Sequence, residues 1–255
     1  MKTKLMAALW LLLTCGNIMA QTQKTLTLDQ LMWGGSEYWN FIPKTPHLAW
    51  WGDCTVQQDV DKVNLYSNAK GALLSDEVLF TLDEVQQAAG EKLAREIRTL
   101  QYVSFPYPDQ TLALISTTHY RVLYDWKARR VTWQLAMPEQ ASHQDWNKES
   151  KALAYVHQDN LYVLTADGKT HQVSSDGSRE VVYGQSVHRD EFGIHKGTFW
   201  SPKGSLLAFY RMDQSMVSDF PLIDIDHRVA QLAPEKYPMA GMTSHKVTVG
   251  VFNPA

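Results

Sequence analysis

Short apolar runs separated by turn-forming residues recur along the chain and predict a protein built from β-strands. In four places an aromatic residue stands seven positions before a Leu-Ala pair that opens such a run; these residues are Phe41, Phe105, Trp146 and Trp200. The intervening residues are polar or turn-forming, because proline presets one backbone dihedral and glycine or aspartate tolerates a tight corner. Each copy therefore predicts two strands joined by a tight turn.

A further apolar run often follows a copy and adds another strand. Such runs lie at 64–66, 122–124 and 160–164, and Asp167-Gly168 predicts a turn into a β-prone run at 171–173. Three or four short strands in each unit of about forty to sixty residues are typical of a β-propeller blade. A β-sandwich is the competing architecture, but it would need neither the repeated aromatic residue nor the recurring Leu-Ala pair. We therefore expect an all-β fold, a partial β-propeller of about four blades.

Two short helical insertions are predicted by capping boxes, in which a threonine caps the first turn and a long polar side chain three residues later answers it. Thr27-Leu28-Asp29-Gln30 and Thr81-Leu82-Asp83-Glu84 fit this pattern. The second helix is expected to continue despite Gly90, because apolar residues at a spacing of four share one helical face: Val85, Ala89, Leu93 and Ile97.

The expected propeller is open. Propellers commonly have four to eight blades, and blades of this size suit the larger rings. Residues 246–252 alternate like a strand in mid-blade. We expect the sequence to be the front portion of a longer protein. An alternative is that the product does not fold, because an open half-propeller exposes strand edges and an apolar blade face.

The first twenty residues differ from the rest. Lys2 and Lys4 precede an apolar run over 5–13, and Ala20 is the small residue that signal peptidase requires. We predict a cleaved signal peptide over 1–20, followed by residues 21–255, and export to the periplasm or the cell exterior. The apolar run is too short to span a bilayer. The alternative localisation is at a membrane, through a lipid anchor on Cys15. It is disfavoured because Thr14 fits a lipoprotein cleavage site poorly.

Composition and charge narrow the function classes. The chain is 44% hydrophobic and 11% aromatic, which is ample for a buried core. Loss of the two lysines in the leader leaves 22 basic against 27 acidic residues, a net charge of −5, so no nucleic-acid partner is expected. Cys54 would then be the remaining cysteine, which excludes an intrachain disulfide, and nothing around it argues for a catalytic thiol.

Two adjacent carboxylates, Asp190 and Glu191, are the candidate binding residues. In an extended strand they would point to opposite faces, but Gly193 and the lack of alternation allow a turn or a short helical segment that brings both to one ligand. Two converging carboxylates bind a cation, and a primary ammonium with three donors is a natural partner. The competing interpretation is a solvated acidic pair neutralised by Arg189 and Lys196.

Other chemistry is not indicated. His188 and His195 flank the acidic pair, but no His-Glu-x-x-His or paired-cysteine spacing exists, so no metal or cofactor is expected. No Gly-x-Ser-x-Gly nucleophile elbow occurs. A Ser-His-Asp triad therefore cannot be assembled from this chain alone, and no catalytic residue is assigned.

The segment 187–217 closely resembles the N-terminal β-propeller of the dipeptidyl peptidase IV family, serine exopeptidases of the prolyl oligopeptidase clan. The resemblance continues through Pro221-Leu222-Ile223 and 236–241 and runs backward, more weakly, through the Trp146 and Phe105 copies. The motifs that carry it are Asp190-Glu191-Phe192, Trp200-Ser201-Pro202-Lys203-Gly204, Leu207-Ala208-Phe209-Tyr210 and Met212-Asp213-Gln214-Ser215.

The resemblance implies an eight-bladed propeller that covers a C-terminal α/β-hydrolase domain, which this chain lacks. It also implies peptide substrates with a free N-terminus, from which dipeptides are removed, usually after proline or alanine. In the family a Glu-Glu pair on a short propeller helix binds that N-terminus, and Asp190 and Glu191 hold the corresponding positions, with Asp in place of the first Glu. A homodimer, as in the family, is a further implied partner.

Two departures from the family pattern limit the comparison. The family grips the substrate carbonyl with a propeller arginine; the corresponding region here, 116–121, is shortened, and the role is not carried over to Arg121, the nearest candidate. After Gly241, Met242-Thr243-Ser244-His245 replaces the common Asn-Pro. We hypothesise the propeller portion of an exported dipeptidyl-peptidase-IV-like serine exopeptidase, inactive without its hydrolase domain. The alternative is a non-catalytic periplasmic propeller that binds peptides or partner proteins.

Overall fold

The computed structural model describes residues 25–43, 45–68, 70–71 and 73–254, so the predicted signal peptide and Cys15 lie outside the described residues. The chain divides into two units, 1–45 and 46–255. The first unit contains the short helix α2 (Leu28–Leu31) and the 3-10 helix η1 (Tyr38–Asn40). α2 begins at the first predicted capping box, where the Thr27 backbone N–H donates to Gln30 Oε1 at 3.2 Å. The first of the two predicted helical insertions is therefore present.

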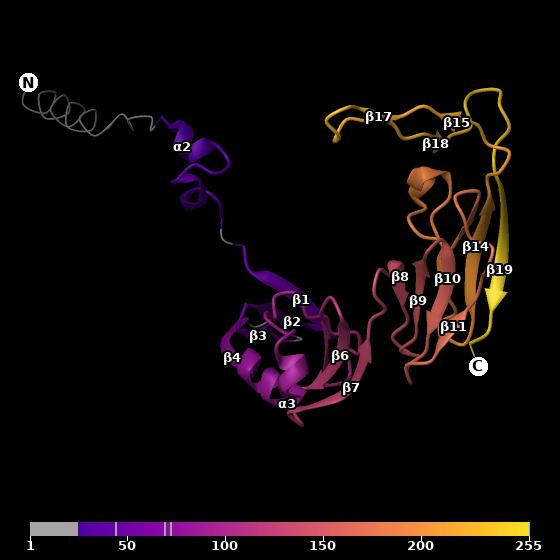
Figure 1. The fold of residues 1–255 in the computed structure, drawn as a ribbon. Helices are drawn as coiled ribbons and strands as arrows, with labels where there is room; N and C mark the ends of the chain where they lie inside the picture. Colours follow the sequence, from indigo (N-terminus) through magenta and orange to yellow (C-terminus); the bar gives the residue numbers. More distant parts are fainter. Residues whose placement is uncertain (1–24, 44, 69, 72, 255) are drawn as a thin grey trace, which may run out of the picture. The chain divides into compact units, whose positions relative to one another are not determined.

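The second unit is built from four antiparallel sheets of three or four strands, which follow one another along the chain (Figure 1). They confirm the prediction of an all-β, partial β-propeller with four blades. In chain order the strands are β1 (His47–Trp51), β2 (Cys54–Gln58), β3 (Lys62–Ser67) and β4 (Leu73–Thr81); β5 (Leu112–Ser116), β6 (Tyr120–Asp125) and β7 (Arg130–Ala136); β8 (Ser142–Trp146), β9 (Leu153–His157), β10 (Asn160–Leu164) and β11 (Thr170–Gln172); and β12 (Val181–Tyr183), β13 (Thr198–Trp200), β14 (Leu207–Asp213) and β19 (Lys246–Phe252).

Successive sheets pack face to face through three apolar clusters. In β9, Leu153 and Tyr155 point into the cluster shared with the second sheet, whereas Ala154 and Val156 point into the cluster shared with the fourth sheet. Side chains alternate between the two faces of a strand, so a strand that is buried on both faces needs a continuous apolar run. This stacking explains why the Leu-Ala pair opens an apolar run rather than an alternating one.

The repeat predicted from the sequence is present in full in the last two copies. Trp146 ends β8 and Trp200 ends β13, and each strand forms a hairpin with the strand that carries the Leu-Ala pair. Phe105 lies next to an isolated bridge between Ser104 and Leu114, because Pro106 and Pro108 cannot donate to a longer ladder. The first copy is half present: its Leu-Ala pair lies in β1, but the strand predicted at Phe41 is wrong, since Phe41 follows η1 and belongs to no strand.

The second predicted helix is α3 (Leu82–Ala94), which starts at the capping box of Thr81 and Glu84. Its predicted apolar face is buried against the first core cluster. As predicted, α3 continues past Gly90, although Gly90 adopts φ 75° and kinks it; the helix ends at Ala94, so Ile97 lies beyond it. Among the described residues, no helix has both the length and the apolar composition needed to cross a membrane.

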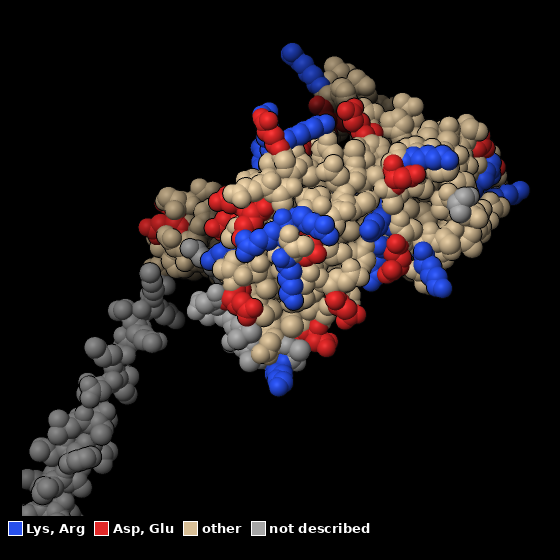
Figure 2. All heavy atoms as spheres, turned by 90° about the horizontal axis from the view of Figure 1, so that it is seen from below, with Lys and Arg blue, Asp and Glu red and all other residues tan. Residues whose placement is uncertain are grey.

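Charged side chains of both signs are interspersed over the face drawn in Figure 2. A nucleic-acid-binding surface gathers Lys and Arg into a continuous stripe or patch. The lack of a nucleic-acid partner, inferred from net charge, stays a prediction.

Candidate functional site

The fourth sheet carries two long insertions, and together they build the candidate site. β12 and β13 both pair with β14, β12 with residues 211–213 and β13 with residues 207–209. The chain between them, residues 184–197, leaves the sheet and returns to it; we call this segment the excursion. Tyr210 hydrogen-bonds to both ends of the excursion, since its carbonyl accepts from Gly184 N at 2.9 Å and its N–H donates to Gly197 O at 2.8 Å.

The two ends of the excursion meet at a narrow neck that requires glycine. A Cβ atom on Gly197 would lie 2.0 Å from the carbonyl oxygen of Gln185. Gly184 adopts φ 62°, which is costly for residues with a side chain. Because the neck brings their ends together, the fourteen residues of the excursion leave the sheet while β12 and β13 both stay paired with β14.

The 3-10 helix η2 (His188–Gly193) forms the tip of the excursion and carries both candidate carboxylates. His188, Asp190 and Phe192 have left-handed backbones, with φ between 54° and 63°. Such residues are uncommon outside glycine and concentrate at functional sites, where the surrounding structure holds them. As a result Asp190 and Glu191, adjacent in sequence, both line one cavity rather than opposite faces of a strand.

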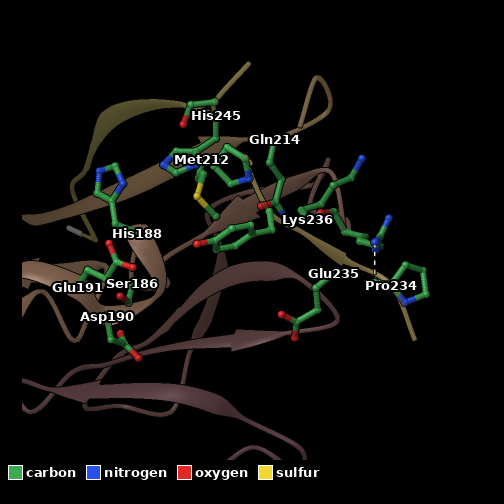
Figure 3. A pocket seen from close by; sticks show the side chains of 14 residues that line it. Ser186, His188, Asp190, Glu191, Met212, Gln214, Pro234, Glu235, Lys236 and His245 are labelled. Atoms are coloured by element: carbon green, nitrogen blue, oxygen red, sulfur yellow. Dashed lines mark hydrogen bonds between the residues drawn. The ribbon is translucent and has the colours of Figure 1, made fainter. Parts of the chain in front are cut away.

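The second insertion connects β14 to β19. It is an extended ribbon, residues 214–245, which we call the arm: β15 (Asp219–Phe220) pairs with β18 (Glu235–Lys236), and β16 (Ile223–Asp224) pairs with β17 (Gln231–Leu232). The base of the arm faces the excursion. A cavity of about 670 Å³, the blade-four cavity, lies between them and is lined from the arm side by Gln214, Glu235, Lys236, Tyr237 and His245 (Figure 3).

Among the described side chains, the cations that line the cavity are Lys236 and Arg179, and both are engaged by carboxylates away from η2. Lys236 Nζ lies 3.2 Å from Glu180 Oε2 and donates to the Val217 carbonyl at 2.9 Å. Arg179 donates to Asp219 at 2.7 Å. These contacts fasten the base of the arm to the segment just before β12. The hydrogen bond to Asp219 raises the pKa of Arg179.

The side chains of Asp190 and Glu191 have no hydrogen bond or ion pair within the described part of the chain. Lys196, predicted as a neutralising partner, instead lies 3.0 Å from Asp145 Oδ2. The same carboxylate oxygen accepts from the buried Thr198 hydroxyl at 2.9 Å, and the Asp145 carbonyl accepts from Trp200 Nε1 at 3.0 Å. Asp145 of β8 thus holds the returning leg of the excursion to the third sheet.

Two histidines close one side of the cavity. The rings of His188 on η2 and His245 at the end of the arm have centroids 4.8 Å apart. Burial, followed by the proximity of His188, lowers the pKa of His245. The sequence offered a weak signal for His245, the departure at 242–245, but gave no reason to pair it with His188.

The other sequence candidates lie elsewhere. Arg121, the nearest candidate for a carbonyl-binding arginine, lies in β6 and donates to Thr117 O and Gln144 Oε1, each at 3.3 Å. It does not line the blade-four cavity. Burial lowers its pKa. His195 is exposed and also lies outside the cavity lining. Among the described residues, no group of three or more His, Cys, Asp or Glu side chains could hold a metal ion.

The fold and the cavity define the class of protein: a β-propeller whose fourth blade carries a carboxylate-lined cavity between two insertions. Residues 100–255 match the family model of the dipeptidyl peptidase IV N-terminal region. The chain therefore belongs to the dipeptidyl peptidase IV family, in its N-terminal region.

Individual relatives agree with this assignment. The chain is 31% identical over 117 residues to dipeptidyl aminopeptidase B of Saccharomyces cerevisiae, covering 42% of this chain and 14% of the yeast protein. It is 25% identical over 261 residues to inactive dipeptidyl peptidase 10 of Rattus norvegicus, covering 95% of this chain and 31% of the rat protein. The chain thus matches less than a third of the length of either relative.

Solved structures share the fold. A candidate dipeptidyl aminopeptidase IV from Bacteroides ovatus superposes with a TM-score of 0.75 at 36% identity, over 91% of this chain and 31% of that chain. Dipeptidyl peptidase 4 of Porphyromonas gingivalis superposes with a TM-score of 0.57 at 19% identity, over 91% of this chain and 34% of that chain, a likeness of fold.

Proposed function

We propose that this chain is the propeller portion of an exported serine exopeptidase of the dipeptidyl peptidase IV type, and that it anchors the N-terminus of the substrate peptide. One observation carries the proposal. η2 turns two adjacent carboxylates, Asp190 and Glu191, toward one cavity, and neither has a partner among the described residues. Unpaired carboxylates at a common cavity are suited to a ligand that brings its own positive charge.

The ligand that fits is the free α-ammonium of a peptide. An ammonium group carries three N–H donors, so it can hydrogen-bond to both carboxylates at once. Fixing the first residue of a peptide also fixes how far its later bonds reach, and this would place the bond after the second residue at a catalytic serine. Such positioning lowers the reaction barrier by arranging the reactants in advance. An α/β-hydrolase domain separate from this chain would supply the hydrolysis.

The proposal is tested by binding of the tripeptide Ala-Pro-Ala-amide to the secreted chain, measured by calorimetry. A hydrogen bond to a charged group contributes about 1.5–3 kcal/mol, so Glu191→Gln should weaken binding about 10- to 100-fold. Asp190→Asn should weaken it as well, to a smaller extent, because the shorter side chain reaches the ammonium less well.

Two controls accompany this measurement. Glu139→Gln removes an exposed carboxylate outside the cavity and should leave the dissociation constant unchanged. The N-acetylated peptide lacks the ammonium and should not bind. Equal binding of the acetylated peptide, or an unchanged dissociation constant in Glu191→Gln, would refute the anchoring role.

A second function is favoured by one comparison. The rat relative whose match extends over 95% of this chain carries the name inactive dipeptidyl peptidase 10. The chain could therefore serve as a non-catalytic propeller that binds peptides or partner proteins through the same cavity. Sequencing the locus downstream separates the two functions: a Gly-x-Ser-x-Gly region followed by Asp and His supports the peptidase, and an unrelated gene supports the binding module.

Export is proposed from the leader sequence. Secreted material should begin at Gln21, as determined by N-terminal sequencing, because cleavage follows Ala20. A lipid-modified Cys15 found by mass spectrometry would refute cleavage after Ala20. The homodimer implied by the resemblance stays a prediction, which sedimentation velocity of the secreted chain would test.

A further inference from the structure

Two histidine rings join the two walls of the blade-four cavity. His188 belongs to η2, and His245 is the last residue of the arm before β19. Their ring centroids are 4.8 Å apart and their planes are inclined by 47°. The Nε2 atom of His245 is buried and has no hydrogen-bond partner among the described residues. The contact therefore links the two insertions directly, at the edge of the site.

We propose that the His188–His245 pair is a pH-sensitive latch on the blade-four cavity: neutral rings hold the excursion and the arm together, and protonation separates them. The latch rests on the proposed function, because it regulates the same cavity that is proposed to receive the peptide N-terminus. The closed latch keeps η2, and with it Asp190 and Glu191, against the arm that forms the opposite wall.

Protonation opposes the closed arrangement for two reasons. Two imidazolium rings at this separation repel each other, and a buried Nε2 without a partner cannot stabilise an added proton. Burial, followed by the proximity of His188, accordingly lowers the pKa of His245. The closed state therefore binds fewer protons than the open state. Closure is favoured above the ordinary imidazole pKa of 6.5 and is lost as the pH falls below it.

Other titratable groups also line the cavity around the pair. They are Asp190 and Glu191 from η2, Arg179 from the segment before β12, and Glu235, Lys236 and Tyr237 from the arm. Carboxyl groups ordinarily titrate near about pH 4, and Lys, Arg and Tyr at about pH 10 or above. The α-ammonium of a peptide has an ordinary pKa of about 7.7–8.0, so acidification can only protonate it further and strengthen its binding. A weakening of binding as the pH falls from about 7.5 to 5.5 would therefore come from histidine.

Protonation also acts on the ligand directly. Figure 3 shows the ring of His188 on the same side of the cavity as Glu191. An imidazolium there would compete with the peptide ammonium for the carboxylates. Opening of the latch and competition for the carboxylates both weaken binding at acid pH, so the two effects reinforce each other.

The first experiment needs no peptide. The chain labelled with ¹³C at histidine Cε1 is titrated by NMR from about pH 5 to 8.5, as wild type and as His188→Gln. The midpoint of His245 should rise in His188→Gln, because a neighbouring positive charge is removed. A His245 midpoint that does not move in His188→Gln would overturn the latch.

The second experiment measures the dissociation constant of Ala-Pro-Ala-amide at about pH 8 and pH 5.5. For wild type we expect a rise of severalfold at the lower pH, because the closed state binds fewer protons than the open state and is therefore disfavoured in acid. The double variant His188→Gln/His245→Gln should show no such rise. His195→Gln, which removes an exposed histidine of the same excursion outside the cavity lining, should behave as wild type.

The outcomes separate the latch from the proposed function. A rise that persists in the double variant would assign the pH dependence to the carboxylates and overturn the latch. Absence of binding at both values of pH would refute the anchoring role, and the His245 midpoint in His188→Gln would then decide alone whether the latch exists. Binding at about pH 8 with the same affinity at pH 5.5 in wild type would support anchoring and refute the latch.

Discussion

Replacing Asp145 with alanine should loosen the excursion from the third sheet, and the structure sets the size of the effect. Asp145 Oδ2 accepts from Lys196 at 3.0 Å and from the Thr198 hydroxyl at 2.9 Å, and the Asp145 side chain is 17% exposed. Thr198 is 1% exposed, so its hydroxyl would lose its acceptor away from water. Leaving a buried hydroxyl unpaired costs about 1–3 kcal/mol.

The ion pair between Lys196 and Asp145 contributes less to the free energy of unfolding than the hydrogen bond to Thr198. The Lys196 side chain is 54% exposed, and salt bridges of this kind contribute about 0–1 kcal/mol. Asp145→Ala should therefore lower the free energy of unfolding by about 2–3 kcal/mol. Asp145→Asn keeps an amide oxygen for Thr198 and loses the charge, so it should cost about 0.5–1 kcal/mol.

Urea denaturation of the secreted chain, followed by tryptophan fluorescence, measures both losses. Asp226→Ala, at an exposed position in the arm, is the matched control and should stay within about 0.5 kcal/mol of wild type. A loss for Asp145→Ala below about 0.5 kcal/mol would refute the reasoning. An equal loss for the asparagine and alanine variants would show that the charge, and not the buried hydroxyl, carries the interaction.

Two further predictions follow from the neck of the excursion and from the second sheet. Gly197→Ala would place a methyl group 2.0 Å from the Gln185 carbonyl oxygen, so it should lower the free energy of unfolding in urea by at least about 2 kcal/mol and abolish peptide binding. Gly193→Ala meets no atom within 4 Å and should cost about 1 kcal/mol for its left-handed backbone. Equal losses in the two variants would contradict the claim that the neck requires glycine. Burial raises the pKa of Asp125, but hydrogen bonds from two backbone N–H groups and the Thr111 hydroxyl outweigh it and hold that pKa below its usual range. The resulting stability is present above about pH 4 and lost as the pH falls through the lowered pKa, so the deficit of Thr111→Val should shrink in acid; a deficit that does not change with pH would be inconsistent with this assignment.

The strands and helix starts were largely predictable from the sequence, because they depend on neighbours along the chain. The Leu-Ala runs at Leu153 and Leu207 became strands, and Thr81 caps a helix, since alternation and capping act over a few residues. The strand predicted at Phe41 did not form, because an aromatic residue at the right spacing does not itself pair with another strand. Phe41 follows a 3-10 turn instead.

The carboxylate pair shows both what the sequence predicts and what depends on the tertiary structure. The sequence, through its resemblance to a family, singled out Asp190 and Glu191 and predicted that they need a turn or a short helical segment to share a ligand. The left-handed backbone at Asp190 lies in a loop whose two ends are held together at the neck of Gly184 and Gly197. A local pattern does not specify such a neck, because its hydrogen bonds run to Tyr210 on another strand.

What the sequence by itself determined is therefore the β-rich repeat, the capped helix and the identity of the candidate anchor. What only the tertiary structure decided is the cavity: which insertion faces η2, that Lys196 turns to Asp145 rather than to the acidic pair, and that His245 meets His188. The physical reason is sequence separation. These contacts join residues about fifty positions apart, and they form because β14 pairs with β12 and β13 on one edge and with β19 on the other, which brings the roots of both insertions together.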